Sequence, residues 1–267
     1  MVRTGGTVNS LNSRAWTAAL VLALAASVAA TTAHPAAAEA WWGHHSRAQK
    51  KNKNEGEASV LVEDRGTLQI RVDGQPAGSE DFEIHESGGA WTARGTADVP
   101  GENGEKAKVT GKMTLTPDGA PIRYECSTTS PRKEAAAVQF DGTVATVEMK
   151  VEGASPYSQE FRFNAPPVVI LDNNMYHQYE ILALLYDWEH KDPKTYSVLI
   201  PQELTPGSVT AEYGGQQVMD GVKVDVLRVR STDLEIDLFC DPAQQERVLR
   251  IEVPAAKAVI VRQSEKK

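Results

Sequence analysis

Hydrophobic and polar residues alternate with a period of two along most of the chain after Gly66. In the first of these segments, Leu68, Ile70 and Val72 are separated by polar residues. The same alternation recurs at residues 81–85, 147–151, 161–163 and 249–253. Successive side chains of a strand point to opposite faces, so this pattern predicts antiparallel strands with one buried and one hydrated face.

Turn sequences separate these segments from one another. An Asp-Gly pair accepts the positive φ values of a tight hairpin turn. Such pairs stand between strand-like runs at residues 73–74, 118–119, 141–142 and 220–221. Four signals of this kind at short spacing predict an antiparallel meander of about twelve to fourteen strands.

One segment breaks the alternation and predicts a helix. The Pro-Pro pair at residues 166–167 ends the strand before it, because proline cannot donate to a strand ladder. Asp172, Asn173 or Asn174 can then cap a helix by accepting backbone N–H bonds. We expect this helix to span residues 173–188.

Apolar side chains surround most of the predicted helix, which is typical of a helix buried on most of its circumference. In a meander, the place for such a helix is inside a sheet that curls around it. The predicted fold class is therefore all-β: a curved antiparallel meander, either a half-barrel or an open barrel, wrapping one mostly apolar helix.

A narrow polar stripe remains on this helix, formed by His177, Glu180 and Asp187. His177 and Glu180 stand three residues apart and can share a hydrogen bond or an ion. In one interpretation the stripe faces a pocket, where the pair contacts a ligand head group or transfers a proton. In the other, the stripe is the hydrated face of the helix, and the pattern favours this second interpretation because solvated stripes are common.

The first forty residues predict a signal peptide. Arg3 and Arg14 precede an uncharged apolar run at residues 15–30, and residues 38–40 (AEA) form a small-residue cleavage site. An uncleaved membrane anchor is the alternative, because the uncharged stretch can extend beyond that run.

The rest of the chain divides into two parts. Residues 41–59 are highly charged, lack periodicity and predict a flexible linker. Residues 60–267 carry the strand pattern and predict a single antiparallel β domain.

The chain is acidic, with 28 Lys+Arg against 36 Asp+Glu and a formal charge of −8. Removal of residues 1–40 leaves 26 basic and 35 acidic residues, a formal charge of −9. Nucleic-acid binding requires a concentrated positive field, so no nucleic-acid partner is expected. We expect an exported protein, periplasmic or secreted, that is not integral to the membrane after signal cleavage. The oligomeric state stays open.

The local motifs of common enzyme classes are absent from the sequence. It contains no G-x-S-x-G nucleophile elbow, no H-E-x-x-H zinc motif and no Walker A loop. We expect no metal and no cofactor, and a non-enzymatic function is favoured over an enzymatic one.

The two cysteines, Cys126 and Cys240, both occupy the inward phase of their predicted strands. In an exported protein they can pair as a disulfide, or they can remain two separate buried thiols that behave as small hydrophobes. The sequence leaves both arrangements open.

Three stretches resemble exported bacterial β-rich proteins that are grouped as domains of unknown function. They are residues 66–80 (GTLQIRVDGQPAGSE), 113–124 (MTLTPDGAPIRY) and 171–179 (LDNNMYHQY). A long antiparallel sheet with a helix in its concavity is also similar in architecture to the half-barrels of LolA/LolB-type lipoprotein carriers. Because architecture does not determine function, the resemblance implies no catalytic residue.

We therefore expect the protein to bind an amphiphilic or lipid-like ligand in the concavity of the sheet, without catalysis. Aromatic rings with a polar edge meet both tail and head group of such a ligand. The expected contacts are Tyr176, His177, Tyr179, Glu180, Tyr186 and Trp188. The alternatives are a structural or envelope-interaction protein with a dry core, and a hydrolase that uses His177 with a carboxylate.

Overall fold

A single fifteen-stranded sheet forms almost the whole fold. The computed structural model describes residues 59–264, except 101–104, 131, 165 and 233. The predicted signal peptide and nearly all of the predicted linker therefore lie outside the described residues. Among the residues that are described, no helix has the length and apolarity to cross a membrane.

The strands follow one another with short connections, as a meander requires. Their bounds are β1 Asp64–Val72, β2 Gln75–Ser87, β3 Ala90–Pro100, β4 Lys106–Leu115, β5 Pro121–Thr128, β6 Glu134–Asp141, β7 Val144–Val151, β8 Tyr157–Arg162, β9 Val168–Ile170, β10 Lys194–Ile200, β11 Thr205–Met219, β12 Val222–Arg230, β13 Glu235–Asp241, β14 Arg247–Val253 and β15 Ala258–Arg262.

The predicted Asp-Gly turns all lie between paired strands. They connect β1 to β2, β4 to β5, β6 to β7 and β11 to β12. Asp73 and Asp220 adopt φ values of 49° and 51°, and the glycines that follow them adopt 75° and 82°. Positive φ at both central residues matches the twist of a two-residue hairpin turn, which explains why this dipeptide marked the strands correctly.

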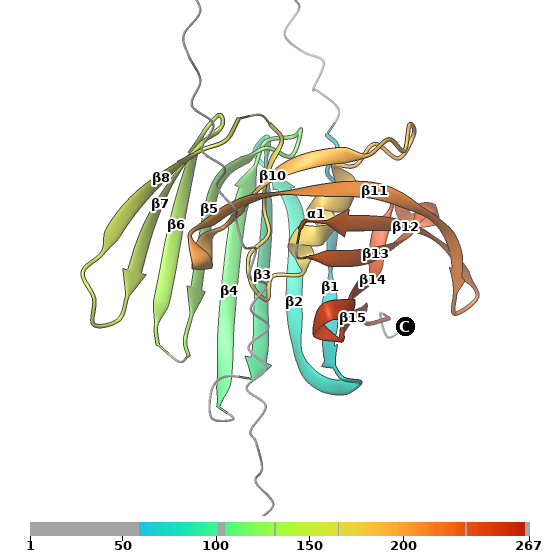
Figure 1. Cartoon of the computed structure of the whole chain (residues 1–267), viewed down its shortest axis with the longest axis horizontal. Coiled ribbons are helices and arrows are strands. Elements are labelled where there is room, and N and C mark those ends of the chain that lie inside the picture. The colour runs from blue at the N-terminus through green and yellow to red at the C-terminus, as the bar shows by residue number, and fades with distance from the viewer. Residues whose placement is uncertain (1–58, 101–104, 131, 165, 233, 265–267) are drawn as a thin grey trace, which may run out of the picture.

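The order of strands runs from β8 through β1 to β15 and back down to β9. Neighbouring strands are antiparallel, except that β9 and β10 are parallel. Figure 1 shows β1 to β8 side by side in one half, while β10 to β15 cross over in the other half. The sheet curves strongly but its ends, β8 and β9, are not paired with each other. The predicted curved, open antiparallel sheet is confirmed.

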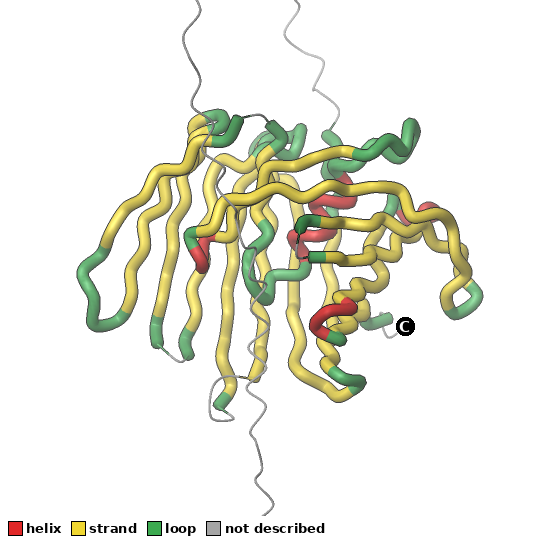
Figure 2. Tube along the Cα trace, viewed as in Figure 1, coloured by secondary structure: helices red, strands yellow, loops and turns green. Residues whose placement is uncertain are grey.

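A short helix, α1 (His177–Leu184), lies inside this curved sheet (Figure 2). It occupies the middle of the expected 173–188 span, and turns flank it on both sides. The helix packs into a large apolar core that includes Ile84, Tyr124, Tyr196 and Leu227, all fully buried. The inner face of the sheet and the helix thus form one continuous core.

Candidate functional site

A carboxylate from the sheet binds the N-terminus of α1. Glu80 of β2 accepts hydrogen bonds through Oε2 from the backbone N–H groups of Tyr176 (2.7 Å) and His177 (3.1 Å). Its Oε1 lies 2.5 Å from Nδ1 of His177, and both side chains are fully enclosed. The first N–H groups of a helix lack partners within the helix and attract negative charge, which Glu80 supplies.

This contact corrects the predicted cap. The N-cap residue is Tyr176 and no side chain adjacent in sequence caps the helix, whereas Asp172, Asn173 or Asn174 had been expected to do so. The capping group instead comes from a strand about a hundred residues away in the chain. The hydrogen-bond acceptor at the helix N-terminus is therefore set by tertiary packing and not by a neighbouring residue in the sequence.

Space for the Glu80–His177 pair depends on a glycine of β3. A Cβ atom added at Gly95 would lie 2.6 Å from Nδ1 of His177, and closer still to Oε1 of Glu80. Such separations are shorter than van der Waals contact, so any larger residue must displace the pair. Gly95 is paired across the ladder with Gly111 of β4, where a Cβ would instead meet the flexible side chain of Met175 and the hydroxyl of Tyr124.

A second buried carboxylate, Glu180, ties the middle of α1 to the other half of the sheet. Its Oε2 accepts hydrogen bonds from the backbone N–H of Val248 in β14 (3.0 Å) and from Nη2 of Arg262 in β15 (3.0 Å). Nη2 of Arg262 also donates to Oδ2 of Asp64 in β1 (2.6 Å). Burial raises the pKa of Glu180 to about 7, although the Arg262 charge acts against this rise.

The polar stripe of the predicted helix is therefore not a hydrated face. His177 and Glu180 are 1% and 4% exposed, and only Asp187, beyond the helix end, is exposed. Nor do His177 and Glu180 bind each other, since each pairs with a separate residue of the sheet. The favoured solvated interpretation was wrong because the sheet encloses the helix on this side too.

A third buried carboxylate, Asp172, joins the segment before α1 to two other elements. Its Oδ2 accepts from the hydroxyl of Tyr124 in β5 (2.8 Å), and its Oδ1 accepts from the N–H of Gln202 (3.1 Å). The N–H of Asp172 donates to Oε1 of Gln178 on the helix. Burial raises the pKa of Asp172, while the Tyr124 hydrogen bond lowers it.

The C-terminal end of α1 is bound by β10. The carbonyl of Leu185 accepts from Nζ of Lys194 (2.9 Å) and from the hydroxyl of Tyr196 (3.0 Å). A cation at this end complements the negative pole of the helix. Strands β2, β5, β10, β14 and β15 therefore each contribute a polar contact to the helix or its flanks. We call these contacts the tethers.

The aromatic residues expected to contact a ligand all lie in the core. Tyr176, Tyr179 and Tyr186 are 3%, 4% and 4% exposed, and Trp188 is half-buried. Tyr186 and Trp188 meet edge to face with ring centroids 5.0 Å apart. The indole N–H of Trp188 donates to the carbonyl of Ala183. These rings cover the inner face of the sheet and are packed against it.

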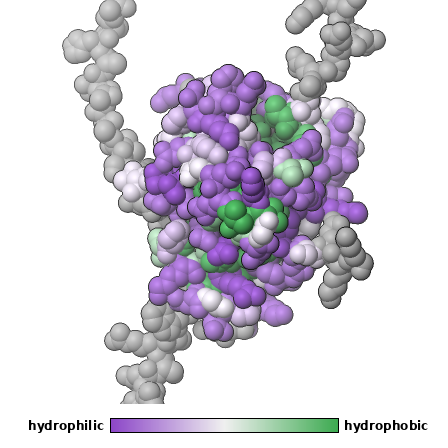
Figure 3. Space-filling view, turned by 90° about the vertical axis from the view of Figure 1, so that its right-hand side faces the viewer, coloured by the Kyte–Doolittle hydropathy of each residue, from purple (hydrophilic) through white to green (hydrophobic). Residues whose placement is uncertain are grey.

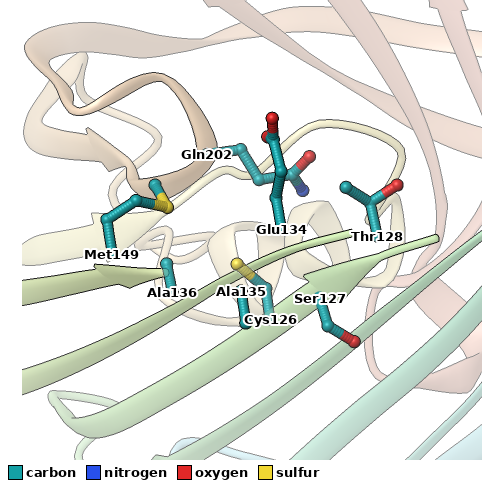
Figure 4. Close-up of a pocket in the computed structure, with 8 residues that line it drawn as sticks. All are labelled: Cys126, Ser127, Thr128, Glu134, Ala135, Ala136, Met149 and Gln202. Carbon is teal, nitrogen blue, oxygen red and sulfur yellow. The ribbon is translucent and has the colours of Figure 1, made fainter. Parts of the chain in front are cut away.

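A small pocket lies in another place, at the seam where the 3-10 helix η2 (Pro201–Glu203) approaches β5, β6 and β7 (Figure 4). Its volume is about 180 Å³, including the solvent at its mouth. Pockets for drug-sized ligands measure roughly 300–1,000 Å³, so this one is too small for an acyl chain. Its lining contains none of the predicted contacts: Cys126, Ser127, Thr128, Glu134, Ala135, Ala136, Met149 and Gln202.

Both cysteines are free and buried in the structure, as two separate thiols. Cys126 belongs to β5 and Cys240 to β13, and burial raises the pKa of each thiol. A buried thiol with a raised pKa remains protonated and unreactive. Within the described ranges, no group of three or more His, Cys, Asp or Glu residues has the geometry to hold a metal ion.

The raised pKa of Glu180 predicts that the protein becomes less stable as pH rises. The folded protein retains a proton on Glu180 up to about pH 7, whereas the unfolded chain releases it near 4.5. The free energy of unfolding should therefore fall between pH 5 and pH 8, by at most about 1.4 kcal/mol per pH unit for this group. Urea denaturation at several pH values measures this slope.

Glu180→Gln is the variant that identifies the group, because glutamine cannot titrate. We expect a shallower slope in Glu180→Gln than in the wild type. Glu246 also has its pKa raised to about 7 by burial, so some slope of the same sign remains. An unchanged slope in Glu180→Gln would contradict the assignment.

Comparisons with known proteins found similarity in structure alone. No protein-family model matches the sequence, and no curated protein matches it. A β-barrel-like protein from Brucella abortus, of the domain of unknown function DUF1849, aligns at 11% identity with a TM-score of 0.49, covering 77% of this chain and 97% of its own. A DUF1089 family protein from Pseudomonas aeruginosa aligns at 10% identity with a TM-score of 0.41, covering 66% and 90%. Both neighbours belong to families of unknown function.

Proposed function

We propose that this is an exported, non-enzymatic protein that binds an amphiphilic or lipid-like molecule on the inner face of its sheet. In this proposal α1 is a cover that the ligand displaces. The observation that carries the proposal is the nature of the attachment: a short helix covers an apolar concave surface and is fixed to it by polar tethers.

The physical reason is an asymmetry between the two kinds of contact. Hydrogen bonds of a tether are exchanged for bonds to water when the helix moves, at a net cost of roughly 0.5–3 kcal/mol each, with the upper end for bonds to charged groups. Water offers no such replacement for the apolar contacts under the helix. Exposing that apolar surface to water costs about 25 cal/mol per Å². An amphiphile compensates this larger cost, because its tail covers the surface that the helix leaves.

The predicted contact residues take distinct roles in this proposal. Tyr179 and Tyr186 belong to the apolar surface that a tail would replace. His177 and Glu180 carry the polar groups that a head group would meet after the helix moves. The Nε2 atom of His177 is buried without a hydrogen-bond partner in the described structure, so it is a donor or acceptor that a head group can satisfy.

The second candidate function is structural, and the number of tethers favours it. Polar contacts reach α1 and its flanks from both halves of the sheet, so the helix can serve as a fixed joint between them. The hydrolase alternative has the pair His177–Glu80, but both side chains are fully enclosed. A substrate would need the same displacement of α1 before reaching them.

A fluorescent fatty acid, whose emission rises in apolar surroundings, distinguishes these functions. We expect the wild type to take up one probe molecule per chain. Glu80→Gln should bind the probe about tenfold more tightly, because a weaker tether makes the binding-competent state more populated. Glu83→Gln is the matched control: it lies on the same strand and pairs with Arg94 at the surface, so binding should not change.

Circular dichroism establishes that each variant is folded before the titration is interpreted. Absence of probe uptake by a folded wild type and a folded Glu80→Gln would contradict ligand binding and support the structural function. If Glu80→Gln does not fold, uptake by the wild type decides between the two functions.

A further inference from the structure

The hairpin between β11 and β12 extends beyond the strands on either side of it. β10 pairs with residues 205–211 of β11, whereas β12 continues to pair with β11 as far as Met219. On the other side, β13 pairs with β12 only from Asp225 onward. Residues 215–224 therefore form a two-stranded ribbon, which we call the arm. Figure 1 shows it at the right edge of the molecule.

A bulge separates the arm from the rest of the sheet. The register between β11 and β12 shifts at Gly214, and Gly215 adopts a φ of 94°. A bulge bends a strand and increases its local twist, which directs the arm away from the sheet. An isolated two-stranded hairpin is only marginally stable in water, so an arm of this kind gains stability from a further contact.

The arm also exposes apolar side chains. Val218 is 70% exposed and Val222 is 41% exposed, the two largest exposures among aliphatic residues of the second half of the sheet. In Figure 3, the face that carries this side of the molecule has an apolar area surrounded by polar residues. The arm thus combines unpaired backbone groups with exposed apolar surface.

The outer edge of the arm, on the side of β11 that faces away from β12, differs in charge from the other open edges of the sheet. Natural proteins protect an open edge with charged residues, proline or shortness. The edge strand β8 carries Glu160 and Arg162 and follows Pro156, and β9 has only three residues. The outer edge of β11 from Gly215 to Met219 (GQQVM) contains no charged residue. The charges beside it belong to other segments: Lys191 lies over the ring of Tyr213, and Lys223 of β12 is paired with Val218. This edge lacks the protection that the others have.

We propose that this edge pairs with the same edge of a second copy of the chain, forming a two-fold symmetric dimer through an antiparallel strand pair centred on Val218. An uncharged strand can oppose itself without bringing like charges together, which makes a second copy a fitting partner. The register places the two Val218 side chains opposite each other, and Met219 opposite Gln217. Aliphatic cross-strand pairs of this kind stabilise a sheet.

Light scattering across a range of protein concentrations tests this dimer. We expect a concentration-dependent dimer in the wild type. Val218→Lys should weaken it by about tenfold or more, because two ammonium groups would face each other across the pair. Gln159→Lys, on the exposed edge of β8, is the matched control and should leave the dimer unchanged.

Cysteine cross-linking tests the register separately. Val218→Cys should form a disulfide-linked dimer under mild oxidation, whereas Gln159→Cys should not, and the two native thiols are buried. A wild type that stays monomeric at every concentration would overturn the proposal. So would a dimer that Gln159→Lys weakens as much as Val218→Lys, or a Val218→Cys protein that forms no cross-link. Binding of the monomer to lipid vesicles alone would assign the arm to a membrane surface instead.

Discussion

Gly95→Ala should lower the free energy of unfolding by about 3 kcal/mol. The new Cβ would lie 2.6 Å from Nδ1 of His177 and must displace the pair that Glu80 forms with it. Both side chains are fully enclosed, so a displaced carboxylate finds no water. Urea denaturation of the purified variant measures the loss.

Gly111→Ala is the control for this prediction, because Gly111 faces Gly95 across the ladder. Its Cβ would meet Met175, whose long thioether side chain can move aside at small cost. It would also lie 3.0 Å from the hydroxyl of Tyr124, which needs to shift by only a few tenths of an ångström. We expect Gly111→Ala to cost about 1 kcal/mol or less. Equal losses of unfolding free energy in the two variants would contradict this prediction. They would mean that steric crowding on this face causes the loss, and not displacement of the Glu80–His177 pair.

Arg262→Met should destabilise the protein by about 3–5 kcal/mol at pH 8. Arg262 is the shared partner of Glu180 and Asp64, and all three side chains are almost fully buried. Its removal leaves Glu180 without its ion-pair partner and leaves Asp64 with only the longer pair to Arg247 (3.3 Å). Breaking a buried ion pair on one side is costly because a charge stays buried without its partner. The loss should be smaller at pH 5, where Glu180 is protonated and carries no charge.

Two further variants make this prediction specific. Glu180→Gln combined with Arg262→Met should be less destabilised than Arg262→Met alone, because the buried charge that lost its partner is gone. Arg94→Met removes an arginine that is 63% exposed and pairs with Glu83, and should change stability by about 0.5 kcal/mol or less. A loss in Arg262→Met that is independent of pH would point to lost packing, with no part for the buried charges.

The sheet was predictable from the sequence because its signals are local. Alternation sets which face of a strand is buried, and Asp73-Gly74 or Asp220-Gly221 fixes a turn within two residues. The existence of the helix was predictable for the same reason, since apolar residues surround it. Its ends were less predictable, because the capping group of His177 comes from a residue 97 positions away.

The tethers were missed because their partners are distant in the chain, yet a signal for them exists. Glu80 has the same strand phase as Phe82 and Ile84, which point into the core, so its carboxylate must be buried with them. Arg262 shares the phase of Ile260 in the same way. A charged residue in the apolar phase of a strand predicts a buried polar contact, although the sequence does not name the partner.

Two helix residues have a different role in the structure from the one expected. His177 and Glu180 were expected to contact a ligand directly, whereas the structure has them bound to the sheet. In the proposed function, ligand binding would require these tethers to open, and the energetics of Glu80 and Arg262 would become part of the binding reaction. This links the stability variants to the proposed function, since the groups that hold the cover also set how readily it moves.

Native mass spectrometry of the protein, purified gently from the envelope fraction of an expressing host, tests whether the sheet carries a ligand. We expect a stoichiometric adduct that is lost on denaturation, and an amphiphile in the organic extract of the same sample. A bare polypeptide mass, together with an extract free of amphiphiles and no uptake of the fluorescent fatty acid, would contradict ligand binding. The helix would then be a fixed joint between the two halves of the sheet.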